Sequence, residues 1–327
     1  MTVMEVAQFC SSSRVMIVAG KGGVGTSTVT AALAIVAARA GSRVLIVEVE
    51  GKSSIPGMFG AEELGYESRP LREGISARTL TPDAALVDYL ETHGMKRVSK
   101  RLARSGALEV VATAVPGMKD ILVLGKVRSL VESDAADLIL VDAPAAGHAI
   151  SFLTSASGLA DSVRMGPVRQ QAANVRALLS DPALCQAILV TLPEETPVNE
   201  LVATAFSIED RVGVALGPVV VNGCIGSLPE GCPLDTASIR QLAELCDQYL
   251  NPSEARELAS AAIFRTERHE LQKGQIERLT RHLPLPQLRL PYVFSSFLGS
   301  SELAILADAL VHSLHCLPHE VAPGQDP

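Results

Sequence analysis

Short runs of apolar residues alternate along the chain with longer segments in which apolar residues recur at helical spacing. The runs are rich in Val, Ile and Leu, which is typical of strands buried in a parallel sheet. Strands that alternate with helices form right-handed βαβ units, so the pattern predicts an α/β fold with one mostly parallel sheet and helices on both faces. We expect strands at 15–19, 43–50, 75–80, 136–142, 187–191, 217–222 and 288–290. We expect helices at 29–39, within 83–132 with a break at 115–117, and at 149–179, 197–208, 237–249, 253–283 and 301–314.

The order of these elements indicates a single α/β domain over residues 13–317 with a helical insert. Residues 1–12 are an N-terminal extension. Residues 318–327 are rich in Pro, Gly and acidic side chains, so we expect them to be disordered. The expected core comprises about 13–60, 133–150 and 184–317, and the expected insert about 83–131 and 150–182.

Charge and composition narrow the class of protein. The formal net charge is −8 and the chain has no extended basic cluster, which argues against nucleic acid as a partner. The basic side chains of residues 96–104 are expected to lie on a solvated helix face. Aromatic residues make up 3% of the chain and Trp is absent, so Ala, Val and Leu must form the core.

The N-terminus predicts a cytoplasmic protein. Residues 1–10 lack the basic segment and the long apolar segment of a secretory signal. The apolar segment 29–40 is too short to span a bilayer. The six cysteines are scattered without a C-x-x-C pair, which favours reduced thiols over a disulfide framework.

A glycine-rich loop follows the first expected strand and opens directly into a helix. This arrangement directs backbone N–H groups and a helix N-terminus at a phosphate. Residues 20–27 fit the P-loop pattern G-x-x-x-x-G-K-[ST], except that Thr26 stands in the place of the lysine. Gly20, Gly22 and Gly25 also fit the dinucleotide pattern G-x-G-x-x-G. The loop therefore predicts that the protein binds a nucleotide, either as a P-loop protein or as a dinucleotide-binding protein.

Other residues favour the P-loop interpretation. Asp142 ends an apolar strand, where a carboxylate can hold Mg²⁺ next to the glycine loop, and Ser27 can supply a hydroxyl to the same ion. The dinucleotide interpretation expects an acidic residue about 20 residues after the glycines, and both Glu48 and Glu50 fit. It leaves Lys21 and the hydroxyl residues after Gly25 unexplained, so we keep a dinucleotide-binding protein as a remote alternative.

The segment from Lys21 to Gly25 resembles the deviant Walker A motif of the SIMIBI class of P-loop NTPases. Together with the segment from Asp142 to His148, it is similar to the ArsA-type ATPase family. That family includes the arsenite-pump ATPase and the ATPase that targets tail-anchored membrane proteins. The resemblance implies a P-loop NTPase that binds ATP or ADP with Mg²⁺, the ion being held by Ser27 and Asp142.

The same resemblance assigns roles to single residues. Lys21 corresponds to the lysine that reaches the phosphates of the partner subunit, and Glu50 takes the place of the aspartate that positions the attacking water; both are candidate catalytic residues. Asn222 matches the asparagine that contacts adenine, and Pro291 matches the later adenine loop. The implied nucleotide-binding residues are Gly20, Lys21, Gly22, Gly23, Val24, Gly25, Thr26, Ser27, Thr28, Asn222 and Pro291.

Departures from the family pattern shape the functional hypothesis. Thr26 replaces the lysine that normally stabilises charge as the γ-phosphoryl group leaves, which predicts a dimeric switch ATPase with weakened or lost hydrolysis. The alternative is a non-catalytic regulatory subunit that pairs with an active paralogous ATPase. Both hypotheses leave a homodimer or a heterodimer open. The C-x-x-C of the tail-anchor-targeting branch is absent, so zinc is not expected. The apolar run 118–130 has two interpretations: a stripe buried against the sheet or a neighbouring helix, or a surface for an apolar protein client or a membrane-protein partner.

Overall fold

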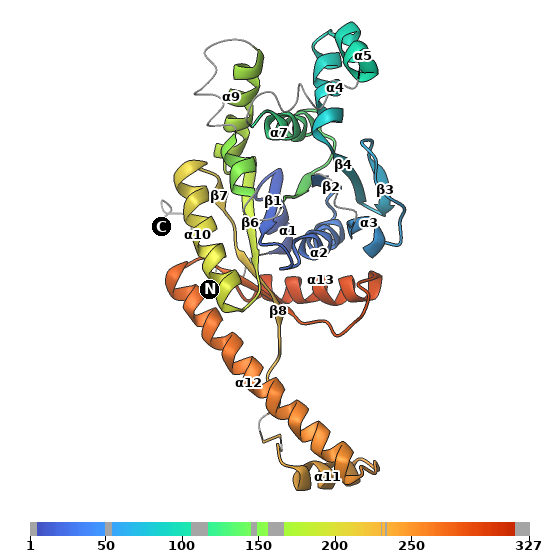
Figure 1. Ribbon diagram of the computed structural model, residues 1–327, viewed down its shortest axis with the longest axis vertical. Coiled ribbons are helices and arrows are strands. Elements are labelled where there is room, and N and C mark those ends of the chain that lie inside the picture. Colours follow the sequence, from blue (N-terminus) through green and yellow to red (C-terminus); the bar gives the residue numbers. More distant parts are fainter. Residues whose placement is uncertain are drawn as a thin grey trace.

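A mostly parallel β-sheet forms the centre of the protein (Figure 1). The computed structural model describes residues 5–49, 54–105, 117–144, 149–155, 167–229, 231–232 and 234–317. These residues form a nine-stranded sheet in the order β3-β4-β2-β5-β1-β6-β8-β9, with β7 beside β6. The strands are β1 (Val15–Gly20), β2 (Val44–Val49), β3 (Arg69–Arg72), β4 (Ile75–Leu80), β5 (Leu138–Asp142), β6 (Cys185–Thr191), β7 (Ala215–Leu216), β8 (Val219–Cys224) and β9 (Gln287–Pro291).

The central strands confirm the predicted α/β fold. Every residue of β1, β2 and β5 is buried, as expected for strands covered on both faces. β1 pairs in parallel with β5 on one side and with β6 on the other. Because parallel strands end at the same edge of a sheet, the carboxyl ends of β1, β2 and β5 lie together there.

Helices cover both faces of the sheet (Figure 1). On one face, α2 and α13 pack in one apolar cluster, and on the other face α7, α9 and α10 contribute to a second. The helices are α1 (Val6–Cys10), α2 (Thr26–Arg39), α3 (Ser54–Met58), α4 (Pro82–Thr92), α5 (Lys96–Ser105), α7 (Met118–Glu132), α9 (Pro167–Ser180), α10 (Glu195–Arg211), α11 (Thr236–Leu245), α12 (Pro252–His282) and α13 (Ser300–His315).

The apolar run 118–130 does not form an exposed face. Ile121, Leu124 and Val127 of α7 are fully buried and pack in the same cluster as β1 and β5. The run is therefore apolar because it contacts the sheet, and it no longer supports a surface for an apolar client. By contrast, Lys96, Arg97 and the other described basic side chains of α5 are exposed, which confirms the predicted solvated helix face.

Four short elements were not expected from the sequence. β3 is antiparallel to β4 and mostly exposed, so its composition carries no apolar signal. β7 has only two residues, and α1 and α3 have five each, which is too short for a helical period to be recognised.

A helical arm, formed by α11 and α12, extends away from the sheet (Figure 1). α12 runs for 31 residues and begins at a complete capping box. Asn251 accepts hydrogen bonds from the N–H groups of Ser253 and Glu254, and the Glu254 carboxylate accepts one from Asn251. Pro252 fills the first helical position, where its missing N–H costs nothing. The predicted helix was correct, but its projection was not foreseen.

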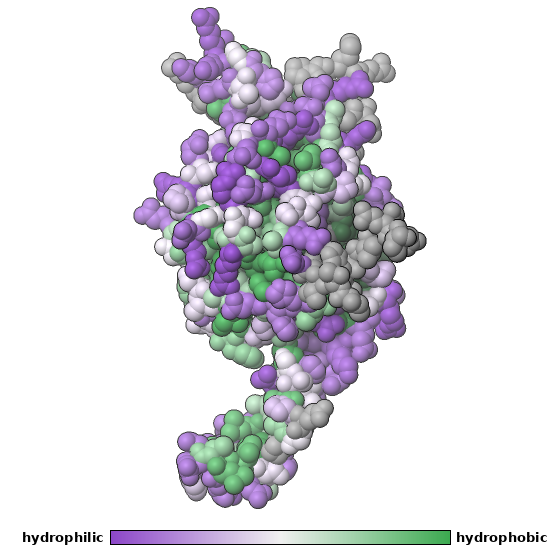
Figure 2. All heavy atoms as spheres, turned by 180° about the vertical axis from the view of Figure 1, so that it is seen from behind, coloured by the Kyte–Doolittle hydropathy of each residue, from purple (hydrophilic) through white to green (hydrophobic). Residues whose placement is uncertain are grey.

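The outer part of the arm is apolar on its surface. α11 has no buried residue, and Leu245 and Tyr249 are 79% and 80% exposed. Figure 2 shows apolar side chains gathered at the far end of the arm. Monomeric proteins rarely expose large apolar patches without a binding role. Among the described residues, no helix combines the length and the apolar character that crossing a bilayer requires.

Candidate nucleotide-binding site

The glycine-rich loop joins the end of β1 to the start of α2. Gly25 is the N-cap of α2 and has φ +90°, a left-handed conformation that favours glycine. The first helical residues follow at once, and the N–H of Val29 donates to the carbonyl of Gly25 at 2.9 Å. The free N–H groups of the first turn and the positive end of the helix dipole therefore face the loop, which is the arrangement that binds phosphate.

Polar side chains of the first turn of α2 contact the end of β5. The hydroxyl of Ser27 donates to Oδ2 of Asp142 at 2.6 Å, and Asp142 is fully buried. Thr26 is the first residue of α2, and its carbonyl accepts the hydroxyl of Thr30 at 2.9 Å. A serine hydroxyl and a carboxylate are hard oxygen donors, so the pair fits Mg²⁺. The structure brings these two predicted metal ligands together.

A buried carboxylate that the motif analysis did not assign to the P-loop lies beside Asp142. Glu48 of β2 is its register partner, and both side chains are fully buried. The Glu48 carboxylate accepts hydrogen bonds from the N–H of Ile55 at 3.2 Å and from the hydroxyl of Thr79 at 3.4 Å. An acidic residue inside the apolar strand VLIVEV is the sequence signal that could have singled it out.

Lys21 is the first residue of the loop after β1 and forms an ion pair within its own chain. Its Nζ donates to Oε1 of Glu200 on α10 at 2.6 Å, and the two side chains are 41% and 42% exposed. No sequence motif links two residues that are so far apart along the chain. Because the pair is open to solvent, water screens it and competes for both charges.

Replacing Glu200 by Gln is expected to have little effect on stability. An exposed ion pair of this kind contributes about 0–1 kcal/mol, so the free energy of unfolding should fall by less than about 1 kcal/mol. Urea unfolding of the variant and of the wild type checks this. Glu209→Gln, at an exposed position of the same helix, is the matched control. A loss above about 2 kcal/mol would show that Lys21 is held in place rather than available.

Asn222 contacts the loop from β8. Its Nδ2 donates to the carbonyl of Val24 at 3.0 Å, and its Oδ1 accepts the N–H of Gly223 at 2.9 Å. A Cβ on Gly25 would lie 2.4 Å from the same Nδ2. The structure therefore places Asn222 against the loop, as expected for a residue of the same site.

The remaining predicted residues are placed as follows. Gly20 ends β1, and Gly22 and Gly23 are exposed in the loop. Val24 and Thr28 are buried beneath it. Pro291 ends β9 next to Cys224, at the same edge of the sheet. Glu50, the candidate for positioning water, and residues 145–148 of the segment from Asp142 to His148 lie outside the described residues.

This combination defines the class of the protein. A buried parallel strand, a glycine-rich loop, a helix that begins in that loop and an acidic residue at the end of the adjacent strand together form the site of a P-loop nucleotide-binding protein.

Comparison with known proteins shows similarity to a family of ATPases over part of the chain. The model of a family described as anion-transporting ATPase matches residues 13–167. ATPase BagA of Mycobacterium tuberculosis (strain ATCC 25618 / H37Rv) is 34% identical over 226 residues, which cover 65% of this chain and 65% of BagA. ATPase get3 of Schizosaccharomyces japonicus is 30% identical over 145 residues, 44% of each chain. Over these stretches the chain is similar to ATPases of the ArsA and Get3 type. The family supports an ATP-binding protein, in agreement with the P-loop interpretation.

Proposed function

We propose that the protein is a nucleotide-dependent dimeric switch ATPase in which hydrolysis is weakened by Thr26. The observation that carries the proposal is the contact between Ser27 and Asp142 at the start of α2. This contact joins the glycine loop to the adjacent strand, as a site for a nucleotide and its metal ion requires. Thr26 precedes Ser27 and has no ammonium group, so the site keeps its means of binding phosphate and lacks one source of charge stabilisation.

Each part of the site has a distinct role in this proposal. The N–H groups at the start of α2 hold the phosphates, and Asn222 and Pro291 flank the base. Ser27 and Asp142 hold Mg²⁺, which when bound neutralises charge on the β- and γ-phosphates. Glu50 orients the attacking water; its side chain is one methylene longer than the aspartate of the family pattern. Such a site binds nucleotide through the backbone and hydrolyses it slowly.

Lys21 supports the dimer in this proposal. Its side chain is 41% exposed, and its partner Glu200 is equally open to solvent. Because an exposed pair is weak, a phosphate of a second subunit can compete for the ammonium group. This observation also favours the second candidate function, a regulatory subunit that supplies Lys21 to an active paralogous ATPase. The two candidates differ in whether the chain hydrolyses ATP by itself.

The partner surface of the proposal lies on the helical arm. The exposed side chains of Leu245 and Tyr249 supply the apolar contact area that the buried run 118–130 does not. We therefore place an apolar protein partner at α11 rather than at α7. A nucleotide site in the sheet and a partner surface on a projecting arm fit a switch protein, in which one site regulates the other.

Asp142→Asn tests the nucleotide and metal site directly. The variant is expected to weaken binding of ATP with Mg²⁺ by about 10- to 100-fold, because it loses a charged ligand to the ion. Titration calorimetry measures this, and Asp137→Asn, just before the other end of β5, is the matched control. Equal affinity of Asp142→Asn and the wild type for ATP with Mg²⁺ would contradict the proposal that Asp142 holds the metal ion. Binding of NAD in preference to ATP would overturn the P-loop interpretation.

A further inference from the structure

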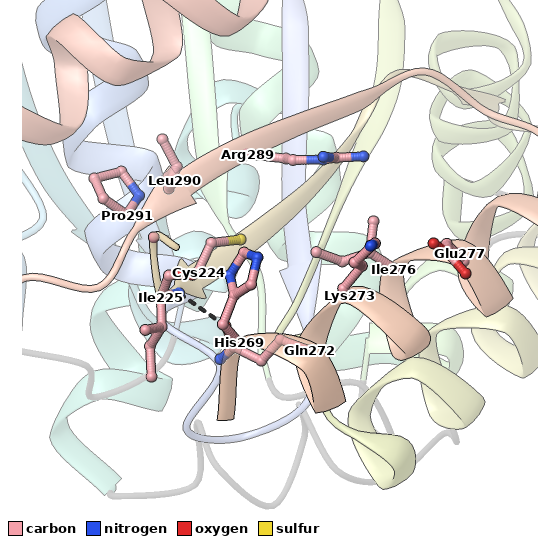
Figure 3. Close-up of a pocket in the computed structure, with 11 residues that line it drawn as sticks. Cys224, Ile225, His269, Gln272, Lys273, Ile276, Glu277, Arg289, Leu290 and Pro291 are labelled. Carbon is pink, nitrogen blue, oxygen red and sulfur yellow. Dashed lines mark hydrogen bonds between the residues drawn. The ribbon is translucent and has the colours of Figure 1, made fainter. Parts of the chain in front are cut away.

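A cavity lies at the base of the helical arm, between α12 and the ends of β8 and β9 (Figure 3). Its volume is about 510 Å³, within the range of small-molecule sites in proteins. Its wall is mostly apolar and includes Ile225, Ile276 and Pro291. A cavity of this size and character binds small molecules with an apolar body.

The cavity is separate from the phosphate-binding loop. Leu288 of β9 packs in the apolar cluster that contains α2 and α13, and Leu290 belongs to this cluster and also borders the cavity at the end of the strand. Since side chains alternate along a strand, Arg289 is directed to the opposite face, where it lines the cavity with α12. Pro291, the proposed contact to the base, lies at the margin of the cavity. Any test must therefore distinguish a second ligand from the base of a nucleotide.

The charged side chains of the cavity favour an anion. Arg289 and Lys273 line it together with a single carboxylate, Glu277. Within the described residues, no carboxylate lies at ion-pair distance from Arg289, and Lys273 has only Glu270 at 4.0 Å. A guanidinium group presents a planar set of N–H donors that matches a carboxylate with two parallel hydrogen bonds.

The remaining polar groups of the wall leave Arg289 available. Burial raises the pKa of the Cys224 thiol to about 11, so this neighbour stays neutral and does not pair with the guanidinium. His269 Nδ1 is occupied by the carbonyl of Ile225 at 2.7 Å. Gln272, only 5% exposed, uses both ends of its amide on the backbone. The charge of the cavity therefore comes from Arg289, Lys273 and Glu277.

Gln272 also connects the cavity to the nucleotide loop. Its Oε1 accepts the N–H of Ile225 at 2.7 Å, and its Nε2 donates to the carbonyl of Gly223 at 3.1 Å. Gly223 follows Asn222, whose amide donates to the carbonyl of Val24 in the loop. A continuous series of hydrogen bonds and one peptide bond therefore joins the cavity wall to the phosphate-binding loop.

We propose that this cavity binds a small amphipathic carboxylate, with its carboxylate on Arg289 and Lys273 and its apolar body against Ile225 and Ile276. A bound molecule orders the wall that contains Gln272 and so favours the contact of Asn222 with the loop. This second statement rests on the proposed nucleotide site. By reciprocity of linked binding, such a ligand and ADP each increase the affinity of the other.

Calorimetry with octanoate as the probe tests the site on the full chain. Octanoate is expected to bind saturably, and octanol more weakly because it lacks the charge. Arg289→Gln is expected to weaken octanoate binding about tenfold or more. Ile276→Trp is expected to abolish it by filling the cavity, with thermal unfolding to verify that the variant is folded. Arg256→Gln, on the exposed outer part of α12, is the matched control and should bind octanoate like the wild type.

The results of these experiments distinguish the carboxylate site, its connection to the nucleotide loop and the proposed function. Octanoate binding that is unchanged in Arg289→Gln or in Ile276→Trp would overturn the site. Displacement of octanoate by ADP would also overturn it, because the cavity would then be the base end of the nucleotide site. The affinity for ADP is expected to rise about fivefold with saturating octanoate. An unchanged affinity would overturn the coupling between the cavity and the nucleotide loop, while the carboxylate site itself would stand. Octanoate binding without any ADP binding would contradict the proposed function alone.

Discussion

Replacing Thr26 by Lys is expected to raise the rate of ATP hydrolysis by about 10²–10³-fold, by analogy with the loss of one preorganised donor in other enzymes. Thr26 is the first residue of α2, and a longer side chain there can follow the loop towards the phosphates. An ammonium group at that place stabilises the charge that develops as the γ-phosphoryl group leaves. Phosphate release under saturating ATP measures the gain.

Thr26→Met is the matched control, because it adds similar length without charge. It should leave the rate at the level of the wild type. If Thr26→Lys restores hydrolysis from zero, the chain is a degenerate ATPase that fits the regulatory alternative. A rate in the wild type that depends on Lys21 would instead identify a working enzyme. No gain in Thr26→Lys, with ATP still bound, would contradict the proposed role of the missing lysine.

Gly25→Ala is expected to disrupt both the loop and nucleotide binding. The residue has φ +90°, and its new Cβ would lie 2.4 Å from Nδ2 of Asn222. The left-handed conformation costs about 1–2 kcal/mol, and the overlap about 1–3 kcal/mol more. Urea unfolding should therefore show a loss of about 2–5 kcal/mol. Calorimetry should show ADP binding weakened or lost.

Gly23→Ala separates the two causes. Gly23 has φ +88°, but no atom lies within 4 Å of the place that a Cβ would occupy. This variant should therefore lose only the conformational part, about 1–2 kcal/mol. Adding Asn222→Ala to Gly25→Ala should recover part of the stability by removing the overlap. Equal losses in the two glycine variants would mean that the contact with Asn222 is unimportant.

The sequence predicted the centre of the fold because its elements are long and strongly patterned. The strand at 138–142 is a continuous apolar run with one terminal carboxylate, and the glycine loop fixes where α2 begins. β3 was missed because its residues are exposed, so burial leaves no pattern in them. The length of α12 was predicted from its sequence. Its projection was not, since the direction of a helix depends on contacts between distant elements.

Only those residues of the candidate site that belong to local motifs could be predicted from the sequence. Ser27 and Asp142 belong to two motifs whose strands are adjacent in a parallel sheet, so their contact follows from topology. Lys21 and Glu200 have no such relation, and only the packing of α10 brings them together. The cavity at Arg289 combines three elements, and none of the residues that line it from α12 belongs to a recognisable motif.

The hydrogen bonds of Gln272 have a mechanical consequence for the arm. The part of α12 from Pro252 to Gln272 is about 30 Å long, at 1.5 Å per residue. A tilt of about 5° where Gln272 is attached would displace the far end by about 3 Å, because displacement grows with the length of the lever. A shift at the end of β8 that tilted α12 would therefore be larger at Leu245 and Tyr249, where the arm exposes its apolar side chains.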